Sequence, residues 1–420
     1  MSAKQITYEN IDPKVRSTIM VGLTLAMLIA CLDGITVSTC GATIASELNG
    51  IVLYSWMVTA YMLCETVMIP ISGKLSDLYG RKPVFLVGLV LFVEGSLLAG
   101  MSASMEMMIA CRALQGLGGG ILIPVATAAV ADLYEPAKRA RMQGMLGAVF
   151  GIGMGLGPVL GGYITEYIGW HWVFYINLPM AVIAFVLTIR KFPMPVDDGE
   201  VLIDYKGMAV LSALLLDIIL LFEFEGDRFE WVSPVTAAMV VLALVLMYVL
   251  VKVEKKAAEP MLAPHLIHNR TVVVACIMML IFGIALTGSM TYSSMFAIYV
   301  LGLSVMEAGE YAIAMVLGMM ITAMGSGQLL TRTGYRPWLA AGPVIGAAAL
   351  FLMSTMGPDT DLTYYAAYLF LLGLGLGCMM STIMVGVQNS AKQSEMGMTT
   401  SAVNLIRSVG STVGTAVFAS

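Results

Sequence analysis

The fold of this chain is constrained most strongly by a succession of long apolar stretches. A helix that crosses a bilayer needs about 20 mainly apolar residues. Thirteen such stretches lie at 17–41, 53–72, 84–103, 106–131, 143–163, 174–192, 207–222, 232–251, 271–300, 307–330, 338–356, 362–387 and 398–420. Hydrophobic residues make up 59% of the 420 residues and charged residues only 12%, which excludes a water-soluble domain. The sequence therefore predicts an all-α membrane protein embedded in a lipid bilayer.

Positive charges gather in one set of loops. Of the 22 lysines and arginines, nineteen lie in the amino-terminal tail or in alternate loops, whereas the other loops contain only Arg228. The remaining two, Arg112 and Arg407, fall inside apolar stretches. Because loops rich in lysine and arginine stay in the cytoplasm, we expect a cytoplasmic amino terminus.

An imperfect repeat indicates that the chain is duplicated. The segment Gly73–Pro83 returns 254 residues later as Gly327–Pro337, with Gly, Leu, Gly and Pro kept at four matching positions. Duplicated membrane bundles are common among secondary transporters. The repeat therefore predicts two pseudo-symmetric helical halves.

The repeat offset is longer than a six-helix half requires, which leaves room for an extra helical hairpin. We expect a six-helix half at 1–192, a linker with two helices at 193–256 and a second half at 257–420. Only five spans are found in the second half. We expect its last helix to be missing from this chain, either beyond Ser420 or through truncation; the alternative is a thirteen-span protein.

Three further segments have a distinctive pattern: an arginine followed by several glycines, a glycine-rich run with one proline, and an aromatic run that ends in proline. They are Arg112–Gly120, the glycine-rich Gly147–Gly162 and Trp170–Pro179. Together with the Gly73–Pro83 hairpin, they resemble the major facilitator superfamily, and within it the EmrB/QacA-like branch of fourteen-helix drug:proton antiporters. The resemblance extends over nearly the whole chain.

This resemblance implies a major facilitator fold and a plasma-membrane protein that works as a monomer and is not an enzyme. It implies export of hydrophobic, cationic small molecules in exchange for protons, without a cofactor or nucleic acid. The sequence contains no Gly-x-x-x-x-Gly-Lys-Ser/Thr phosphate loop, so the driving force is expected to be an ion gradient. The six cysteines are scattered without ligand spacing, and no metal site is expected.

Two charges inside the membrane are the main candidates for proton coupling. Asp33 lies about 24 Å into the first span, and Arg112 lies about 9 Å from the opposite face in the fourth. An isolated charge in hydrocarbon costs several kcal/mol, so we expect these two residues to pair. Because arginine keeps its charge, the pair is a candidate proton switch at Asp33.

Two more carboxylates, Glu65 and Glu94, are expected to be buried without a basic neighbour. They are assigned as proton-coupling candidates, with structural and substrate-binding roles left open. Asp33, Gln115, Glu94 and Asn404 are expected to line the substrate cavity. Arg407 could either snorkel to the interface or contact substrate.

The hairpin of the first half is a candidate gate. Asp77 is expected to accept hydrogen bonds from the amides that open the last span, where a helix dipole favours an anion. Arg81 is expected to meet Asp132 at the same membrane face. With Gly73 and Gly80, these residues would form a latch that opens when the halves rock.

Glycines of the fifth span are the second gating element. In the resembled family this segment lies at the moving interface between the halves. Gly153, Gly157 and Gly161 would let another helix approach closely, and Pro158 favours a bend. Ordinary tight packing is the alternative for any single glycine.

Two other functions remain open. One is a carrier for a specific metabolite or anion, in which Arg112 binds the ligand. The other is a membrane sensor that kept the bundle but does not transport.

Overall fold

The computed structural model describes residues 11–191, 204–224, 233–257 and 269–419, so Arg228 lies outside the described residues. Every regular element in these ranges is a helix. The helices are α1 (Pro13–Glu47), η2 (Ile51–Leu53), α2 (Tyr54–Leu78), α3 (Arg81–Gly100), α4 (Met105–Leu133), α5 (Pro136–Tyr167), α6 (His171–Tyr175), α7 (Asn177–Lys191), α8 (Tyr205–Phe224), α9 (Pro234–Glu254), α10 (Arg270–Tyr299), α11 (Val305–Thr333), α12 (Arg336–Met353), α13 (Leu362–Ser390), η4 (Gln393–Glu395) and α14 (Met396–Ala419).

A helix occupies each of the thirteen predicted spans. Within the described ranges, twelve spans are long and apolar enough to cross a membrane, which confirms an all-α, multi-pass membrane protein. The last predicted span is helix α14, which is not among these twelve. The sixth span is divided between α6 and α7 near Ile176.

Local capping explains where several of these helices begin. Ser104 and Asp361 accept hydrogen bonds from the first amides of α4 and α13. Ser304 and Glu307 form a reciprocal capping box at the start of α11. Such side chains satisfy amides that have no partner within their own helix, which would otherwise be costly in an apolar surrounding.

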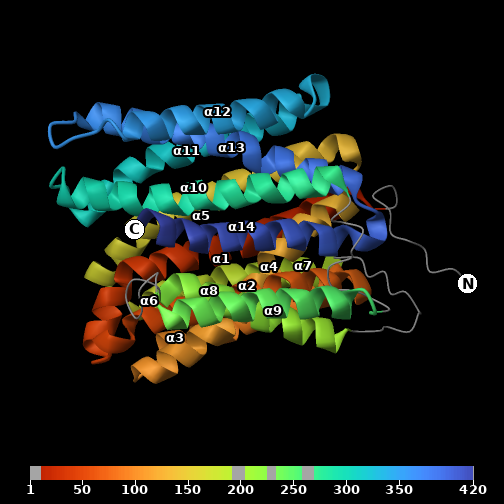
Figure 1. Cartoon of the computed structure of the whole chain (residues 1–420), viewed down its shortest axis with the longest axis horizontal. Coiled ribbons are helices and arrows are strands. Elements are labelled where there is room, and N and C mark those ends of the chain that lie inside the picture. Colours follow the sequence, from red (N-terminus) through yellow and green to blue (C-terminus); the bar gives the residue numbers. More distant parts are fainter. Residues whose placement is uncertain (1–10, 192–203, 225–232, 258–268, 420) are drawn as a thin grey trace, which may run out of the picture.

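The long helices run roughly parallel to one another in two groups (Figure 1). In the first group α4 packs on α2 and α3, and α1 packs on α5 and α7. In the second group α13 packs on α11 and α12, and α10 packs on α14. The two groups meet along two seams, α5 against α11 and α2 against α14. These seams are where any relative motion of the groups must occur.

The two repeated hairpins share a backbone conformation. Gly80, between α2 and α3, has φ 85°, and Gly334, between α11 and α12, has φ 74°. A residue with a side chain is strained in this left-handed region, so glycine is required at both turns. The two groups thus use equivalent connections at the same end of the bundle, which we call the basic end because it carries Arg81, Arg139 and Arg336.

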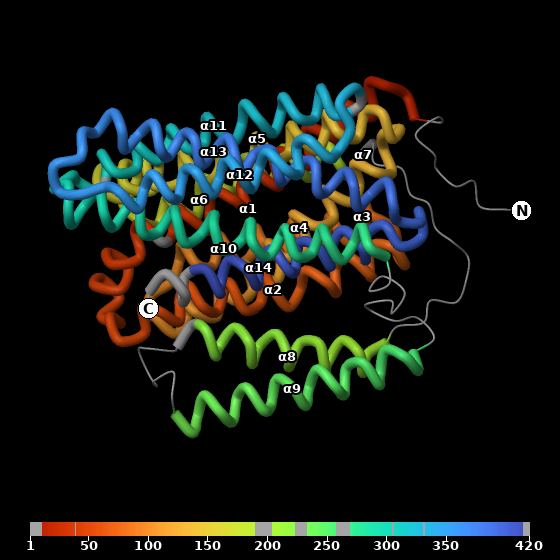
Figure 2. Tube along the Cα trace, turned by 45° about the horizontal axis from the view of Figure 1, so that its top comes forward, coloured from red at the N-terminus to blue at the C-terminus, as the bar shows by residue number. Residues whose placement is uncertain are grey.

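Helices α8 and α9 form a hairpin along one edge of the bundle (Figure 2). Helix α8 packs against α2 and α14, so it covers the seam between the two groups. Leu211, Leu215 and Leu405 are buried in this contact. Much of the apolar surface of α9 is exposed, for example Val241, as expected of a helix that faces lipid.

Candidate functional site

A buried ion pair joins α1 to α4. Arg112 Nη1 lies 2.5 Å from Asp33 Oδ2, and each residue is only 1% exposed. The prediction that these two residues pair is therefore confirmed. Pairing removes most of the cost of placing either charge alone in a low-dielectric region.

Two amide side chains complete the surroundings of Asp33. Gln115 Nε2 and Asn177 Nδ2 donate to Asp33 Oδ1 at 2.8 and 2.9 Å. Arg112 also donates to Gln115 Oε1 at 2.6 Å, and its guanidinium lies 4.2 Å from the ring centroid of Tyr61. Both Asp33 oxygens have donors, and all five residues belong to the first group of helices.

Asn177 and Tyr61 were not predicted as members of this site. Asn177 also donates to Ser96 Oγ at 3.1 Å, which connects α7 to α3. The available signal was the position of Asn177, a lone amide near the start of the predicted span at 174–192. Tyr61 gave no signal because one aromatic residue in an apolar helix is usual.

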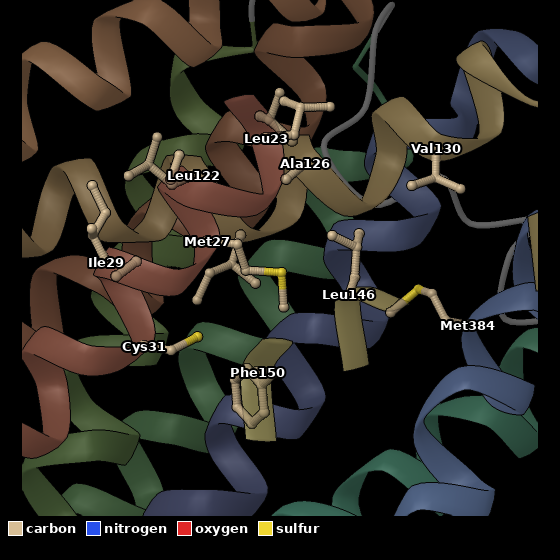
Figure 3. Close-up of a cluster of buried hydrophobic side chains, with 14 of the residues drawn as sticks. Leu23, Met27, Ile29, Cys31, Leu122, Ala126, Val130, Leu146, Phe150 and Met384 are labelled. Atoms are coloured by element: carbon tan, nitrogen blue, oxygen red, sulfur yellow. The ribbon is translucent and has the colours of Figure 1, made fainter. Parts of the chain in front are cut away.

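A small cavity lies between the two groups of helices. Its free space is only about 10 Å³, room for roughly one water molecule, so this cavity is closed in the structure. In Figure 3, Met27, Leu146 and Phe150 lie near one another, with Met384 beside Leu146. The lining is formed by Met27, Ile123, Thr127, Gln143, Leu146, Gly147, Phe150, Met380, Ser381, Met384, Asn404 and Arg407.

Of the four predicted cavity residues, Asn404 lies in this lining. Asp33 and Gln115 lie instead in the buried network and do not line the cavity in this closed state. Asn404 Nδ2 is 3.4 Å from Thr127 Oγ1, a contact that crosses from α14 to α4.

Glu94 is not buried, so that expectation is wrong. Its side chain is exposed on α3, on the same face as Val87, Val90 and Leu97. Depth along a helix could be read from the sequence, but the direction in which Glu94 points could not. That direction follows from how α3 packs on α4.

Glu65, expected to lack a basic neighbour, interacts with two arginines. Helix α2 continues to Leu78, which places Glu65 near the middle of the helix. It interacts electrostatically with Arg407 and Arg112. The expectation of no basic neighbour is therefore wrong, because Arg407 comes from the other group of helices.

Arg407 lines the cavity instead of reaching the membrane interface. The residue is 8% exposed, and its guanidinium lies 5.2 Å from the ring centroid of Phe150 on α5. Of the two alternatives left open by the sequence, snorkelling is excluded for this structure.

Asp77 contacts the start of α14, as predicted. Its Oδ1 accepts from Gly397 N at 2.8 Å, and its Oδ2 accepts from Met398 N at 2.7 Å. Gly73 lies against the same turn, where an added Cβ would meet Ser401 and the carbonyl oxygen of Gly397. The two groups of helices are thus joined at the basic end by a carboxylate at a helix N-terminus.

Arg81 connects this contact to α4. Its Nε lies 2.7 Å from Asp132 Oδ2 and its Nη1 lies 2.7 Å from Asp77 Oδ1. The predicted meeting of Arg81 and Asp132 is confirmed. Gln393 Nε2 donates to the other oxygen of Asp132, which adds a second link between the groups.

A further link at the basic end was not predicted. Arg139 Nη1 of α5 donates to Asn389 Oδ1 at 3.2 Å and to the carbonyl oxygen of Gln388 at 3.4 Å. Gln388 Nε2 donates to the carbonyl oxygen of Thr127 at 2.8 Å. In the sequence, Arg139 is one of the nineteen basic residues of the tail and alternate loops, and its partner Asn389 gives no signal because it lies 250 residues away in the chain.

The predicted gating glycines lie on a different face of α5 than expected. Positions 153, 157 and 161 face Cys31, Ile35 and Thr36 of α1, within the same group of helices. Their expected place at the interface between halves is therefore wrong. Positions 144, 151 and 155 face α11 instead, because successive residues on a helix turn by about 100°.

Pro158 does lie at the seam. A Cβ added to Gly309 at the start of α11 would lie 3.4 Å from Pro158 Cβ. The α5 helix therefore presents one small-residue face to α1 and another to α11, with Pro158 at the end of the second face.

Comparison with known proteins identifies relatives over nearly the whole chain. The model of the Major Facilitator Superfamily matches residues 23–415. The chain is 34% identical over 399 residues to multidrug transporter protein MdtP of Bacillus subtilis (strain 168), which covers 95% of this chain and 74% of MdtP. It is 35% identical over 409 residues to the MFS-type transporter Rv1877 of Mycobacterium tuberculosis, covering 97% of this chain but only 60% of Rv1877.

The arrangement of helices is also similar to a solved structure. Superposition on the crystal structure of the human organic anion transporter MFSD10 gives a TM-score of 0.69, covering 97% of this chain and 93% of that chain. The sequence identity is 16%, so this likeness concerns the fold alone.

Proposed function

The chain belongs to the major facilitator superfamily, and we propose that it exports hydrophobic small molecules across the cell membrane in exchange for protons. It is a multi-pass membrane transporter and not an enzyme. The observation that supports proton coupling most directly is the Asp33–Arg112 pair, buried at 1% exposure among hydrogen-bonding amides.

Finer assignments accompany this proposal. The α8–α9 hairpin and the similarity to MdtP support placing the chain in the EmrB/QacA-like branch. We further propose that 1–192 and 257–420 act as the two halves, that 193–256 is the linker, and that the basic end faces the cytoplasm. The protein is proposed to work as a monomer.

The mechanism begins with the charge on Asp33. Protonation makes the Asp33 carboxyl neutral, so its contact with the charged Arg112 weakens from an ion pair to a hydrogen bond. The positive charge of Arg112 is then no longer balanced, and we expect the packing of α1 to change. Helix α1 contacts the glycines of α5 through Cys31 and Ile35, and α5 contacts α11 on its other face. A proton taken up in the first half thereby alters the seam with the second half.

Cargo is proposed to bind in the cavity between the two groups of helices. Its apolar lining, including Met27, Leu146 and Phe150, suits hydrophobic molecules, and unbranched methionine adapts to different shapes. We do not propose cationic cargo, because Arg407, the charged side chain in the described lining, is positive and would repel a cation. The contacts of Asp77 with α14 and of Arg81 with Asp132 stabilise the state in which the basic end is closed.

The test uses proteoliposomes that contain the purified full chain and the uncharged fluorescent probe phenylnaphthylamine. A pH gradient should drive probe movement, and Asp33→Asn should reduce that flux about tenfold or more per folded protein. Asp359→Asn, an exposed acid in the loop before α13, is the matched control and should leave the flux unchanged.

Because Asp33→Asn leaves Arg112 unpaired, the double variant Asp33→Asn/Arg112→Gln is measured as well. It keeps hydrogen-bonding groups at both positions without any net charge, so it should fold and bind the probe but not respond to the pH gradient. Proton-driven flux that survives in both variants would refute the assigned role of Asp33.

The geometry argues against one of the two alternatives, and the flux assay tests the other. A carrier in which Arg112 holds an anion is disfavoured, because Arg112 is occupied by Asp33 and Gln115. A non-transporting sensor predicts probe binding without flux in the same proteoliposomes.

A further inference from the structure

Arg407 is a buried positive charge that the coupling mechanism above does not use. It projects from α14 into the cavity between the two groups of helices. Across the described ranges, no carboxylate oxygen lies within 4.0 Å of a guanidinium nitrogen of Arg407, which is the distance limit for an ion pair. Arg112, the other arginine inside the bundle, has such a partner in Asp33.

The surroundings of Arg407 do not compensate this charge. Its aromatic neighbour is Phe150, and a cation–π contact stabilises a guanidinium by about 0.5–2 kcal/mol. An uncompensated charge at membrane depth costs several kcal/mol. The nearby amide of Asn404 is engaged with Thr127 and the carbonyl oxygen of Thr400. The charge therefore needs water or an anionic group from outside the protein.

Glu65 is the carboxylate best placed to compete for Arg407. The two residues interact electrostatically without forming an ion pair. Their chain neighbours Thr66 and Ser408 share a hydrogen bond of 2.8 Å across the seam. Glu65 and Arg407 thus lie at the same depth on opposite sides of the α2–α14 seam.

We propose that Arg407 is an anion subsite of the transport cavity and that the cargo includes amphipathic organic anions. Their carboxylate or sulfonate group would bind the guanidinium, and their apolar body would pack on Met27, Leu146 and Phe150. The cavity in this structure has room for only about one water molecule, which is too small for such an anion. The subsite would therefore be reached only when the two halves move apart. This inference rests on the proposed transport function and specifies its substrate class.

Charge complementarity supports this occupant over a cation. Arginine binds planar anions through two parallel hydrogen bonds, which are stronger than bonds between neutral groups. A cation in the same space would face the guanidinium at close range. Without a bound anion, the nearby Glu65 carboxylate interacts with Arg407 but forms no ion pair with it, so the guanidinium remains available to an anionic group.

The experiment compares two probes that share one aromatic scaffold. Anilinonaphthalenesulfonate carries a sulfonate that the uncharged phenylnaphthylamine lacks. Binding of each probe to the purified full chain in a neutral detergent is measured by fluorescence, with displacement by an excess of the non-fluorescent naphthalenesulfonate to remove the micelle signal.

Arg407→Gln should weaken binding of the sulfonate probe about tenfold or more, while binding of the uncharged probe changes less than about threefold. Arg407→Lys should retain most of the preference, because the positive charge remains. Glu65→Gln should strengthen sulfonate binding several-fold, because the competing carboxylate is gone. Arg270→Gln removes an exposed arginine at the start of α10 and should change neither affinity.

An unchanged ratio of the two affinities in Arg407→Gln would overturn the proposal. If Arg407→Gln does not fold, Glu65→Gln provides the test. The proposal is then overturned if Glu65→Gln binds the sulfonate probe with the same affinity as the unmodified protein. Flux of the uncharged probe driven by a pH gradient tests the transport function separately. If a pH gradient drives flux but Arg407→Gln leaves the ratio of the two probe affinities unchanged, only the anion subsite is refuted. If Arg407→Gln changes that ratio but no flux is detected, only the transport function is refuted.

Discussion

At the scale of single residues, two buried arginines show how surroundings decide a role. Arg112 has a carboxylate, an amide and an aromatic ring around it, all from the first group of helices. Arg407 has an aromatic ring and a more distant carboxylate from the opposite group. The partners of the first arginine thus all come from one half, whereas the second has no ion pair among the described residues and is available to a ligand.

This difference predicts unequal effects on stability. Arg112→Gln should destabilise the protein by about 3–5 kcal/mol, because it leaves Asp33 buried without its counter-charge. Adding Asp33→Asn should recover part of that loss, since no lone charge then remains. The melting temperature of the purified protein, followed by tryptophan fluorescence, measures both effects. Arg332→Gln, an exposed position on α11, is the control, and equal melting temperatures for the single and double variants would contradict the prediction.

At the scale of elements, α5 has two small-residue faces with different neighbours. A Cβ added at Gly157 would lie 2.9 Å from Ile35 Cβ of α1, within one group of helices. A Cβ added at Gly155 would lie 2.6 Å from Val316 Cγ2 of α11, across the seam. One helix thus packs inside its own half and also forms part of the surface on which the halves move.

The two faces can be separated by matched substitutions. Gly157→Val should destabilise the first half by about 1–3 kcal/mol through overpacking, with little change in flux per folded protein. Gly155→Val should reduce flux per folded protein about tenfold, because it wedges α5 from α11. Yield after size-exclusion chromatography and probe flux in proteoliposomes give the two readouts. The assignment of faces fails if both variants lose flux to the same extent.

At the scale of the whole molecule, many polar links between the two groups gather at the basic end. They include Asp77 with the first amides of α14, Asp132 with Gln393, and Arg139 with Asn389. Helix α8 covers the α2–α14 seam from outside. The structure is therefore sealed at the basic end, and opening that end requires breaking several charge-assisted hydrogen bonds together.

Removing the contact at α14 should shift the molecule toward opening. Each hydrogen bond to a charged group contributes about 1.5–3 kcal/mol, so Asp77→Ala should raise the open population at least about tenfold. Spin labels at the exposed positions Lys138 and Lys392, in a background without the six cysteines, report the separation across the basic end by double electron–electron resonance. Longer distances are expected in Asp77→Ala but not in Asp359→Asn, and identical distance distributions would contradict the latch.

The sequence by itself predicted a helix in each of the thirteen apolar stretches, because an apolar run of this length is stable in a bilayer only when its backbone groups are bonded within a helix. It also predicted that Asp33 and Arg112 pair, since an isolated charge at membrane depth is costly and the two residues lie at similar depth. The hairpin contacts of Asp77 and Arg81 followed from a recognisable motif.

Only the tertiary structure decided which way side chains point and which distant helices they meet. Glu94 faces outward, and Gly157 faces α1, because the rotation of a helix about its axis is set by packing against its neighbours. Glu65 and Arg407 lie 342 positions apart in the chain, like the Thr66–Ser408 bond beside them, and approach only when the two groups assemble. The cavity between these groups therefore could not be read from either half alone.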